Sequence, residues 1–174
     1  YLGDNVLRKN LTDYTKKFSS SGLDAMILLC EVDNPSKFGV AYIDKEDSMK
    51  IKSIIEKPKN PTSNLAVIGV YFLTPKIFDV IDDLKPSSRG ELEITDALQL
   101  LMDKGNKIAY DIVTGWWKDT GTPEDIIHAN RLVLDSIGTD EQFIAEKDVS
   151  IKGNIIIGNN TEISQDSSII GPAI

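Results

Sequence analysis

Two long apolar runs, residues 25–32 and 66–73, constrain the fold of this chain more than any other feature of its sequence. The first run is continuous rather than alternating, which indicates a β-strand covered on both faces. The second run is the strongest strand candidate in the chain. Because Gly69 interrupts its interior with a residue that has no side chain to pack, we expect another segment to approach the backbone closely there.

Strand and helix patterns alternate through most of the chain. An amphipathic helix is predicted from Leu11, Tyr14 and Phe18, which recur at spacings of three and four residues. The alternation favours an α/β fold over an all-α or an all-β fold. The remaining expected strands cover residues 38–43, 51–55 and 108–113. Three further helices are expected: one that begins at Pro75, one that contains Ala97 and Leu101, and one that spans residues 123–137.

The net charge of −8 argues against a general binding surface for nucleic acids or for anionic membranes. It does not exclude a small anionic ligand, because local lysines and arginines decide whether such a ligand binds. Cys30 is the only cysteine, so it cannot form a disulfide within the chain, and its apolar neighbours predict a buried thiol. No apolar run approaches the length of a membrane span, and we expect a cytoplasmic protein.

Four isoleucines near the end of the sequence recur every six residues. They are Ile151, Ile157, Ile163 and Ile169. A period of six is neither helical nor that of a plain amphipathic strand. It is typical of a β-helix, in which each hexad supplies one flat face with an inward aliphatic side chain. The alternative is a chance spacing in a tail that is rich in isoleucine.

Residues 115–123 combine two tryptophans, a carboxylate and a glycine in front of a predicted helix. Thr122 is predicted to cap this helix, Pro123 suits its first position, and Asp125 completes a capping box with Thr122. Asp119 allows two interpretations. Taken alone it is more often a turn former, whereas a carboxylate presented beside a helix start can also hold a cation.

Charged residues fall where predicted strands end or helices begin. They are Asp4, the pair Glu56 and Lys57, Arg89 and Asp119. Taken singly, Asp4 is better explained as a turn former, and the Glu56–Lys57 pair as a solvated ion pair. Taken together, two aspartates and two cations converging on one edge of a sheet suit an anionic phosphate ligand with Mg²⁺.

The order of six segments is more specific than any one of them. These segments are Gly3-Asp4-Asn5, Phe38-Gly39-Val40, Glu56-Lys57-Pro58, Ser63 through Phe72, Arg89 through Asp96, and Trp117 through Thr122. In this order they resemble the sugar-1-phosphate nucleotidylyltransferases, especially the glucose-1-phosphate thymidylyltransferases, over residues 1 to about 135.

The resemblance implies a fold as well as a family. Residues 1–138 are expected to be the C-terminal part of a nucleotidyltransferase domain, an α/β, partial Rossmann-like (GT-A-like) mixed sheet. Residues 149–174 are similar to the left-handed parallel β-helix of hexapeptide repeats that many relatives carry. We expect them to form the beginning of such a β-helix.

The resemblance also implies roles for individual residues. Asp4 and Asp119 match the two aspartates that bind Mg²⁺ in the family. Lys57 and Arg89 match the cations that bind the phosphate of the sugar and serve catalysis. The residues expected to contact the sugar are Glu56 at its hydroxyls, Gly39 and Val67 beside it, Tyr71 lining the pocket and Trp117 as an aromatic wall.

The implied reaction is attack of a sugar-1-phosphate oxygen on the α-phosphorus of dTTP or UTP, which releases pyrophosphate and forms an NDP-sugar. Glucose 1-phosphate is the expected sugar substrate. Because no covalent enzyme intermediate is needed, the protein has to align the reacting oxygens and neutralise charge with the metal, lysine and arginine. The family resemblance also favours a homo-oligomer.

Both ends of the sequence lead us to expect a longer protein. It begins with Tyr1 at a predicted strand end and stops at Ile174 within a hexad. The glycine-rich nucleotide loop of the family is expected before Tyr1, so we expect the 174-residue chain to be inactive by itself. The alternative is a non-catalytic regulatory subunit of the same fold. An acyltransferase acting through the β-helix is not supported, because no histidine lies among the hexads.

Overall fold

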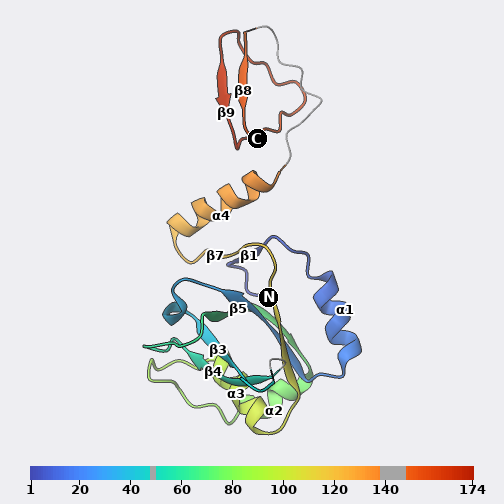
Figure 1. The fold of residues 1–174 in the computed structure, drawn as a ribbon, viewed down its shortest axis with the longest axis vertical. Coiled ribbons are helices and arrows are strands. Elements are labelled where there is room, and N and C mark those ends of the chain that lie inside the picture. The colour runs from blue at the N-terminus through green and yellow to red at the C-terminus, as the bar shows by residue number, and fades with distance from the viewer. Residues whose placement is uncertain (48–49, 138–147) are drawn as a thin grey trace. The chain divides into compact units, whose positions relative to one another are not determined.

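The computed structural model describes residues 1–47, 50–137 and 148–174. The chain forms two compact units, Tyr1–Trp117 and Lys118–Ile174 (Figure 1). In the described residues, the first unit contains a five-stranded sheet with its helices, and the second contains one long helix and a pair of short strands.

A five-stranded mixed sheet forms the centre of the first unit, in the strand order β4-β3-β5-β2-β6. Strand β5 is antiparallel to both of its neighbours, β3 is antiparallel to β4, and β6 is parallel to β2. Helix α1 precedes β2, and helices α2 and α3 lie between β5 and β6 along the sequence, so the predicted α/β fold with a mixed sheet is confirmed. The strands are β2 (Ala25–Glu31), β3 (Gly39–Ile43), β4 (Ile51–Glu56), β5 (Leu65–Leu73) and β6 (Ile108–Ile112).

Short helices connect the strands of this unit. Helix α1 (Thr12–Ser21) begins after Asn10, whose side-chain oxygen accepts a hydrogen bond from the Thr12 amide at 2.8 Å. It ends at Gly22, where the left-handed backbone (φ 65°) suits a residue without a Cβ. The other elements are β1 (Asn5–Leu7), the 3₁₀ helices η1 (Pro35–Lys37) and η2 (Pro75–Ile77), α2 (Phe78–Ile81) and α3 (Ile94–Asp103), while β7 (Trp117–Asp119) straddles the boundary between the units.

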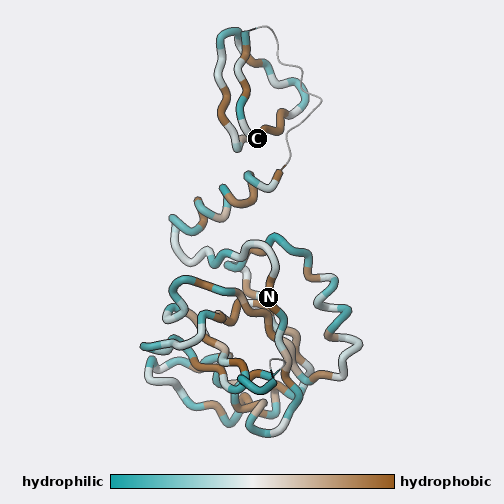
Figure 2. The backbone as a smooth tube through the Cα atoms, in the orientation of Figure 1, coloured by the Kyte–Doolittle hydropathy of each residue, from teal (hydrophilic) through white to brown (hydrophobic). Residues whose placement is uncertain are grey.

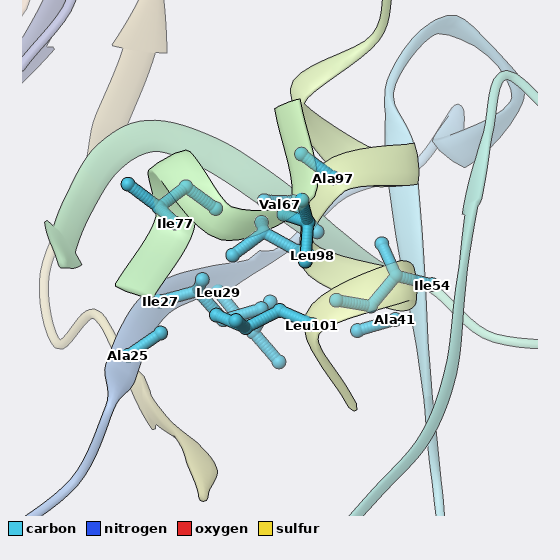
Figure 3. Packing of buried hydrophobic residues seen from close by; sticks show 11 residues of the cluster. Ala25, Ile27, Leu29, Ala41, Ile54, Val67, Ile77, Ala97, Leu98 and Leu101 are labelled. Atoms are coloured by element: carbon cyan, nitrogen blue, oxygen red, sulfur yellow. The ribbon is translucent and has the colours of Figure 1, made fainter. Parts of the chain in front are cut away.

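One face of the sheet packs against α2 and α3. Ala97, Leu98 and Leu101 of α3 lie against the strands in the same cluster as Ile27 and Leu29 of β2 (Figure 3). All five side chains are at most 1% exposed. Burial of each of the larger ones contributes about 1.5–3 kcal/mol, which fixes α3 on the sheet.

The other face packs against α1. Met26 and Leu28 of β2 form a cluster with Tyr14 of α1 and with Ile68 and Val70 of β5. Successive residues of β2 therefore point into two different cores, which explains why its sequence is apolar throughout. The hydrophobic colour in Figure 2 accordingly concentrates in the strands of the sheet. The prediction that this run is covered on both faces is confirmed.

Residues near the N-terminus pass close to the backbone of β5 at Gly69. The Leu2 amide donates a hydrogen bond to the Gly69 carbonyl at 2.8 Å, and the Gly69 amide donates one to Asn5 Oδ1 at 3.0 Å. A Cβ at position 69 would lie 2.6 Å from Asn5 Nδ2, which is too close for any side chain. The close approach that this glycine predicted is confirmed.

The second unit begins with a capped helix. Helix α4 (Pro123–Ser136) follows Thr122, whose Oγ1 accepts a hydrogen bond from the Asp125 amide at 3.3 Å. The predicted cap and the proline at the first helical position are therefore both present. Across the described ranges of the chain, no helix has the length and apolar character needed to cross a membrane.

Two short parallel strands follow in the second unit, β8 (Ser150–Lys152) and β9 (Ser168–Ile170). Ile151 pairs with Ile169, eighteen residues further along, and this separation equals three hexads. The left-handed β-helix itself stays a prediction. So does the expected division between residues 1–138 and 149–174, of which residue 138 lies outside the described residues.

Candidate functional site

The register of three strands brings three of the predicted sugar-binding residues together. Gly39 on β3 is paired with Glu56 on β4 and also with Val67 on β5. A Cβ on residue 39 would lie 2.5 Å from Thr95 Cγ2 and 3.0 Å from Glu56 Oε2. Only glycine therefore fits at this point of β3 while Thr95 and Glu56 keep their positions.

Glu56 lies between two cations at the end of β4. Its Oε1 atom is 3.5 Å from Arg89 Nη1 and 4.0 Å from Lys57 Nζ. Its Oε2 atom accepts a hydrogen bond from the Thr95 hydroxyl at 3.0 Å. The side chain is 18% exposed, so it is partly accessible from solvent. The structure thus brings the predicted residues Glu56, Lys57 and Arg89 into one cluster.

Arg89 is held by more acidic residues than the sequence predicted. Its Nη2 atom donates to Glu91 Oε2 at 2.8 Å, and its Nη1 atom donates to Glu93 Oε1 at 3.2 Å. The carboxylate of Glu93, a buried residue, also accepts a hydrogen bond from the Ser87 hydroxyl at 2.9 Å. A phosphate that binds Arg89 has to compete with these carboxylates. Its competition with Glu91 is mild, because an exposed ion pair contributes little free energy.

Lys57 has an unusual backbone for a residue with a side chain. Its φ is 39°, in the left-handed region that L-amino acids rarely adopt. The Lys57 amide donates to the Phe38 carbonyl at 3.0 Å, and Pro58 follows directly, so the chain is anchored on both sides of the lysine. Strained residues of this kind are concentrated at functional sites.

Asn5 joins two other predicted site residues. Its Oδ1 atom accepts hydrogen bonds from the Gly69 amide at 3.0 Å and from Trp117 Nε1 at 2.7 Å. Its Nδ2 atom donates to Asp4 Oδ1 at 2.8 Å. The Trp117 ring also meets Phe38 edge to face, with centroids 5.4 Å apart. Asn5 is only 6% exposed, so the positions of Asp4 and Trp117 depend on a buried amide.

Tyr71 is electrostatically linked to both groups of residues. Burial raises the pKa of its phenol to about 12, with further contributions from the negative charges of Glu56 and Asp4. The two carboxylates are secondary to burial, and both act in the same direction on the phenol.

The segment before Asp119 differs from the predicted turn. Residues Trp117–Asp119 form a strand, β7. The preceding Trp116 carbonyl accepts a hydrogen bond from the Arg8 amide at 3.2 Å, and the Trp117 indole is fixed by Asn5. These long-range hydrogen bonds hold the segment extended, and the local sequence does not reveal them.

Asp119 belongs to the second unit, where its surroundings are those of a helix start. A Cβ on Gly121 would lie 3.8 Å from each carboxylate oxygen of Asp119. Lys118 Nζ lies 2.6 Å from Asp125 Oδ1, and its hydrogen bond is the main cause that lowers the pKa of Asp125, followed by that from Thr122. Because Asp4 lies in the first unit, joint binding of a metal by Asp4 and Asp119 stays a prediction. Among the residues with described positions, no group of three or more His, Cys, Asp or Glu could hold a metal ion.

Residues 1–136 match the family described as nucleotidyl transferase. The chain belongs to this family. A low-salt glycan biosynthesis nucleotidyltransferase, Agl11 of Haloferax volcanii, is 46% identical over 155 residues, which are 89% of this chain and 43% of that protein. A glucose-1-phosphate thymidylyltransferase of Streptomyces antibioticus is 39% identical over 175 residues, which are 100% of this chain and 48% of that protein.

Solved structures of nucleotidyl transferases share the fold. A UDP-glucose pyrophosphorylase in complex with UDP-glucose is 32% identical and superposes with a TM-score of 0.64, covering 74% of this chain and 52% of its own. The Rossmann-like class of the predicted fold is therefore confirmed. The chain spans about half the length of the curated relatives it matches.

The pKa of Tyr71 predicts a loss of stability of this chain at alkaline pH. In the unfolded chain the phenol ionises near pH 10, and in the folded chain near pH 12. Its contribution to stability is therefore complete below pH 10 and is lost as the pH rises to about 12. We expect absorbance titration at 295 nm of the chain and of Tyr71→Phe to give a difference curve with a midpoint near pH 12. A midpoint near pH 10 would contradict the burial of this phenol.

Two polar residues of the candidate site could not be recognised from the sequence. Asn5 and Thr95 lie inside segments that carry the family resemblance, but the sequence indicates no role for either. Both are buried in the first unit, and both bind predicted site residues. The sequence offers one indication for each residue: Asn5 directly follows the candidate carboxylate Asp4, and Thr95 is a polar residue at the start of an apolar helix. These indications are weak, because the partners are far away in sequence.

Proposed function

We propose that this chain carries the sugar-phosphate-binding part of an enzyme that transfers a nucleotidyl group from dTTP or UTP to a sugar 1-phosphate. Glucose 1-phosphate is the proposed sugar. The observation that carries the proposal is the cluster of Glu56 with Lys57 and Arg89, next to Gly39 and Val67. It combines a carboxylate for hydroxyl groups with two cations for a phosphate. Membership of the nucleotidyl transferase family and the named activities of the relatives support the same assignment.

The roles of the residues follow from the chemistry of the reaction. An oxygen of the sugar phosphate forms a bond to the α-phosphorus of the nucleoside triphosphate, and the bond from this phosphorus to pyrophosphate breaks. Lys57 and Arg89 neutralise the sugar phosphate, which would otherwise be repelled by the triphosphate. Glu56 accepts hydrogen bonds from sugar hydroxyls. Val67, Tyr71 and Trp117 surround the ring, and Gly39 lets it approach the sheet.

A divalent metal belongs to this proposal, because nucleotidyltransferases of this family generally use one. Asp4 and Asp119 would hold the ion. Carboxylate oxygens are the ligands that Mg²⁺ prefers, and Mg²⁺ binds through one or two carboxylates plus phosphate oxygens and water, so a pair of aspartates is a sufficient set. When bound, Mg²⁺ supplies positive charge for the phosphates. Within the chain, Asn5 orients the Asp4 carboxylate through its hydrogen bond to Oδ1.

The proposal assigns only part of the reaction to these 174 residues. Since the relatives are about twice as long, we expect the chain by itself to bind sugar phosphate without turnover. A cytoplasmic location and a homo-oligomeric state belong to the proposal for the whole enzyme. The regulatory-subunit alternative is disfavoured, because a subunit without catalysis has no need for the predicted metal aspartates and for Lys57.

Titration calorimetry of the 174-residue chain tests the proposal. With Mg²⁺ present, we expect glucose 1-phosphate to bind more tightly than glucose or inorganic phosphate, because it uses both the carboxylate and the cations. No release of pyrophosphate is expected from dTTP or UTP with glucose 1-phosphate. If glucose 1-phosphate binds no better than inorganic phosphate, the proposed sugar site is wrong. Turnover by this chain alone would contradict the proposal that the chain carries only part of the catalytic site.

A further inference from the structure

Arg89 lies in a cluster where carboxylates outnumber cations. In the part of the chain that the structure describes, its guanidinium meets the carboxylates of Glu56, Glu91 and Glu93. Lys57, which lies 4.0 Å from Glu56, is the second cation of the cluster. Three negative charges therefore face two positive ones. Because a phosphate brings further negative charge, it binds here more tightly if one of the three carboxylates withdraws.

Two of these carboxylates are fixed by hydroxyl groups. Glu93 is buried, and its Oε1 atom accepts a hydrogen bond from the Ser87 hydroxyl at 2.9 Å. The Oε2 atom of Glu56 accepts one from the buried Thr95 hydroxyl at 3.0 Å. If either carboxylate moved away, a partly or fully buried hydroxyl would lose its acceptor, which is costly. We therefore expect Glu56 and Glu93 to stay in place when a ligand binds.

Glu91 differs from both. Its side chain is 61% exposed, and among the described residues its carboxylate has one polar partner, Arg89, whose Nη2 atom donates to Oε2 at 2.8 Å. The backbone of this turn is held separately, because the Ser87 amide donates to the Glu91 carbonyl at 2.8 Å and the Gly90 amide donates to the Ser87 carbonyl at 2.9 Å. The Glu91 side chain can therefore turn into solvent while its backbone stays in place. Since an exposed ion pair contributes little free energy, this movement costs little.

We infer that Glu91 is a displaceable counter-ion of Arg89: it holds the guanidinium until a ligand binds and then gives up Nη2 to the phosphate of the sugar 1-phosphate. This inference rests on the proposed function, in which Arg89 binds that phosphate. During the exchange, Arg89 Nη1 keeps its contacts with Glu93 at 3.2 Å and with Glu56 at 3.5 Å. Glu91 therefore weakens the binding of the phosphate group and leaves recognition of the sugar ring unchanged.

Glu91→Gln removes the negative charge and keeps the size of the side chain. In titration calorimetry of the 174-residue chain, we expect this variant to lower the Kd of glucose 1-phosphate and of inorganic phosphate about threefold, the effect of one exposed ion pair. Binding of glucose, which has no phosphate, should not change. Glu46→Gln is the matched control, because Glu46 is exposed, precedes β4 at the end opposite to Glu56 and has the same charge. It should bind all three ligands like the unchanged chain.

A second measurement follows the exchange of partners directly. When glucose 1-phosphate is added to the unchanged chain, we expect the side-chain carboxyl ¹³C resonance of Glu91 to shift, because the carboxylate loses its cation. This resonance is identified by its absence in Glu91→Gln, and glucose alone should leave it in place.

Two results would overturn the inference. One is a Glu91→Gln variant that binds the two phosphate ligands no more tightly than Glu46→Gln does. The other is binding of glucose 1-phosphate without a shift of the Glu91 resonance. If the unchanged chain does not bind glucose 1-phosphate at all, the proposed function is wrong, and this inference is wrong with it.

Discussion

Asn5→Ala is expected to lower the free energy of unfolding by about 3 kcal/mol. The substitution removes the oxygen that accepts hydrogen bonds from the Gly69 amide and from Trp117 Nε1. A buried donor left without an acceptor costs about 1–3 kcal/mol, and this change leaves two of them. Urea denaturation followed by tryptophan fluorescence measures the loss, because Trp117 is one of the affected partners.

A matched control separates the loss of these two buried hydrogen bonds from the general effect of removing an asparagine side chain. Asn60 is exposed, and Asn60→Ala should change the unfolding free energy by less than about 0.5 kcal/mol. In ¹H–¹⁵N spectra of Asn5→Ala, we also expect one of the two tryptophan indole resonances to move, as Trp117 loses its acceptor. Equal stability of Asn5→Ala and Asn60→Ala would contradict the role of Asn5 as a buried connector.

The sheet was predictable because burial on two faces leaves a mark on the sequence. Met26, Ile27, Leu28 and Leu29 point alternately into two cores, and a central strand covered on both faces accounts for such an uninterrupted apolar run. Gly69 was informative for the same reason, since its missing side chain has a steric cause that the structure identifies. The strand order was not predictable, because it depends on contacts between distant segments.

The candidate site was predictable in its charged residues and not in their partners. Glu56, Lys57 and Arg89 stood out as charges at predicted element ends, and the structure brings them together. Their surroundings were hidden. Nothing in the sequence marks Glu91 and Glu93 as partners of Arg89, and the turn before α3 brings both carboxylates to the guanidinium.

The hydrogen bonds of Asn5 were equally hidden. It meets Gly69 and Trp117 across separations of 64 and 112 residues, and no local pattern encodes such contacts. The same limit applies to Asp119. Its place before a capped helix could be predicted from Thr122 and Pro123, whereas its relation to Asp4 depends on tertiary structure.

Lys57 offers a test in which stability and binding change in opposite directions. Its left-handed backbone (φ 39°) costs a residue with a Cβ about 1 kcal/mol, and glycine adopts this conformation freely. We expect Lys57→Gly to raise the free energy of unfolding by up to about 1 kcal/mol. The same substitution removes the ammonium group that the proposed function places at the sugar phosphate. The Kd of glucose 1-phosphate should therefore rise at least about tenfold.

Lys57→Ala is the matched variant, because it removes the ammonium group but keeps the Cβ and hence the backbone strain. In the unchanged chain, the ion pair between Lys57 and Glu56 is long, at 4.0 Å, and contributes little stability. We expect Lys57→Ala to unfold like the unchanged chain and to bind glucose 1-phosphate as weakly as Lys57→Gly. Urea denaturation measures the stability of the unchanged chain and of the two variants, and calorimetry measures their affinity for glucose 1-phosphate. If Lys57→Gly is no more stable than Lys57→Ala, the backbone at residue 57 is not strained. If both variants keep full affinity, the lysine does not bind the phosphate. Opposite changes in stability and in binding are the expected result where a strained residue is kept for function and not for the fold.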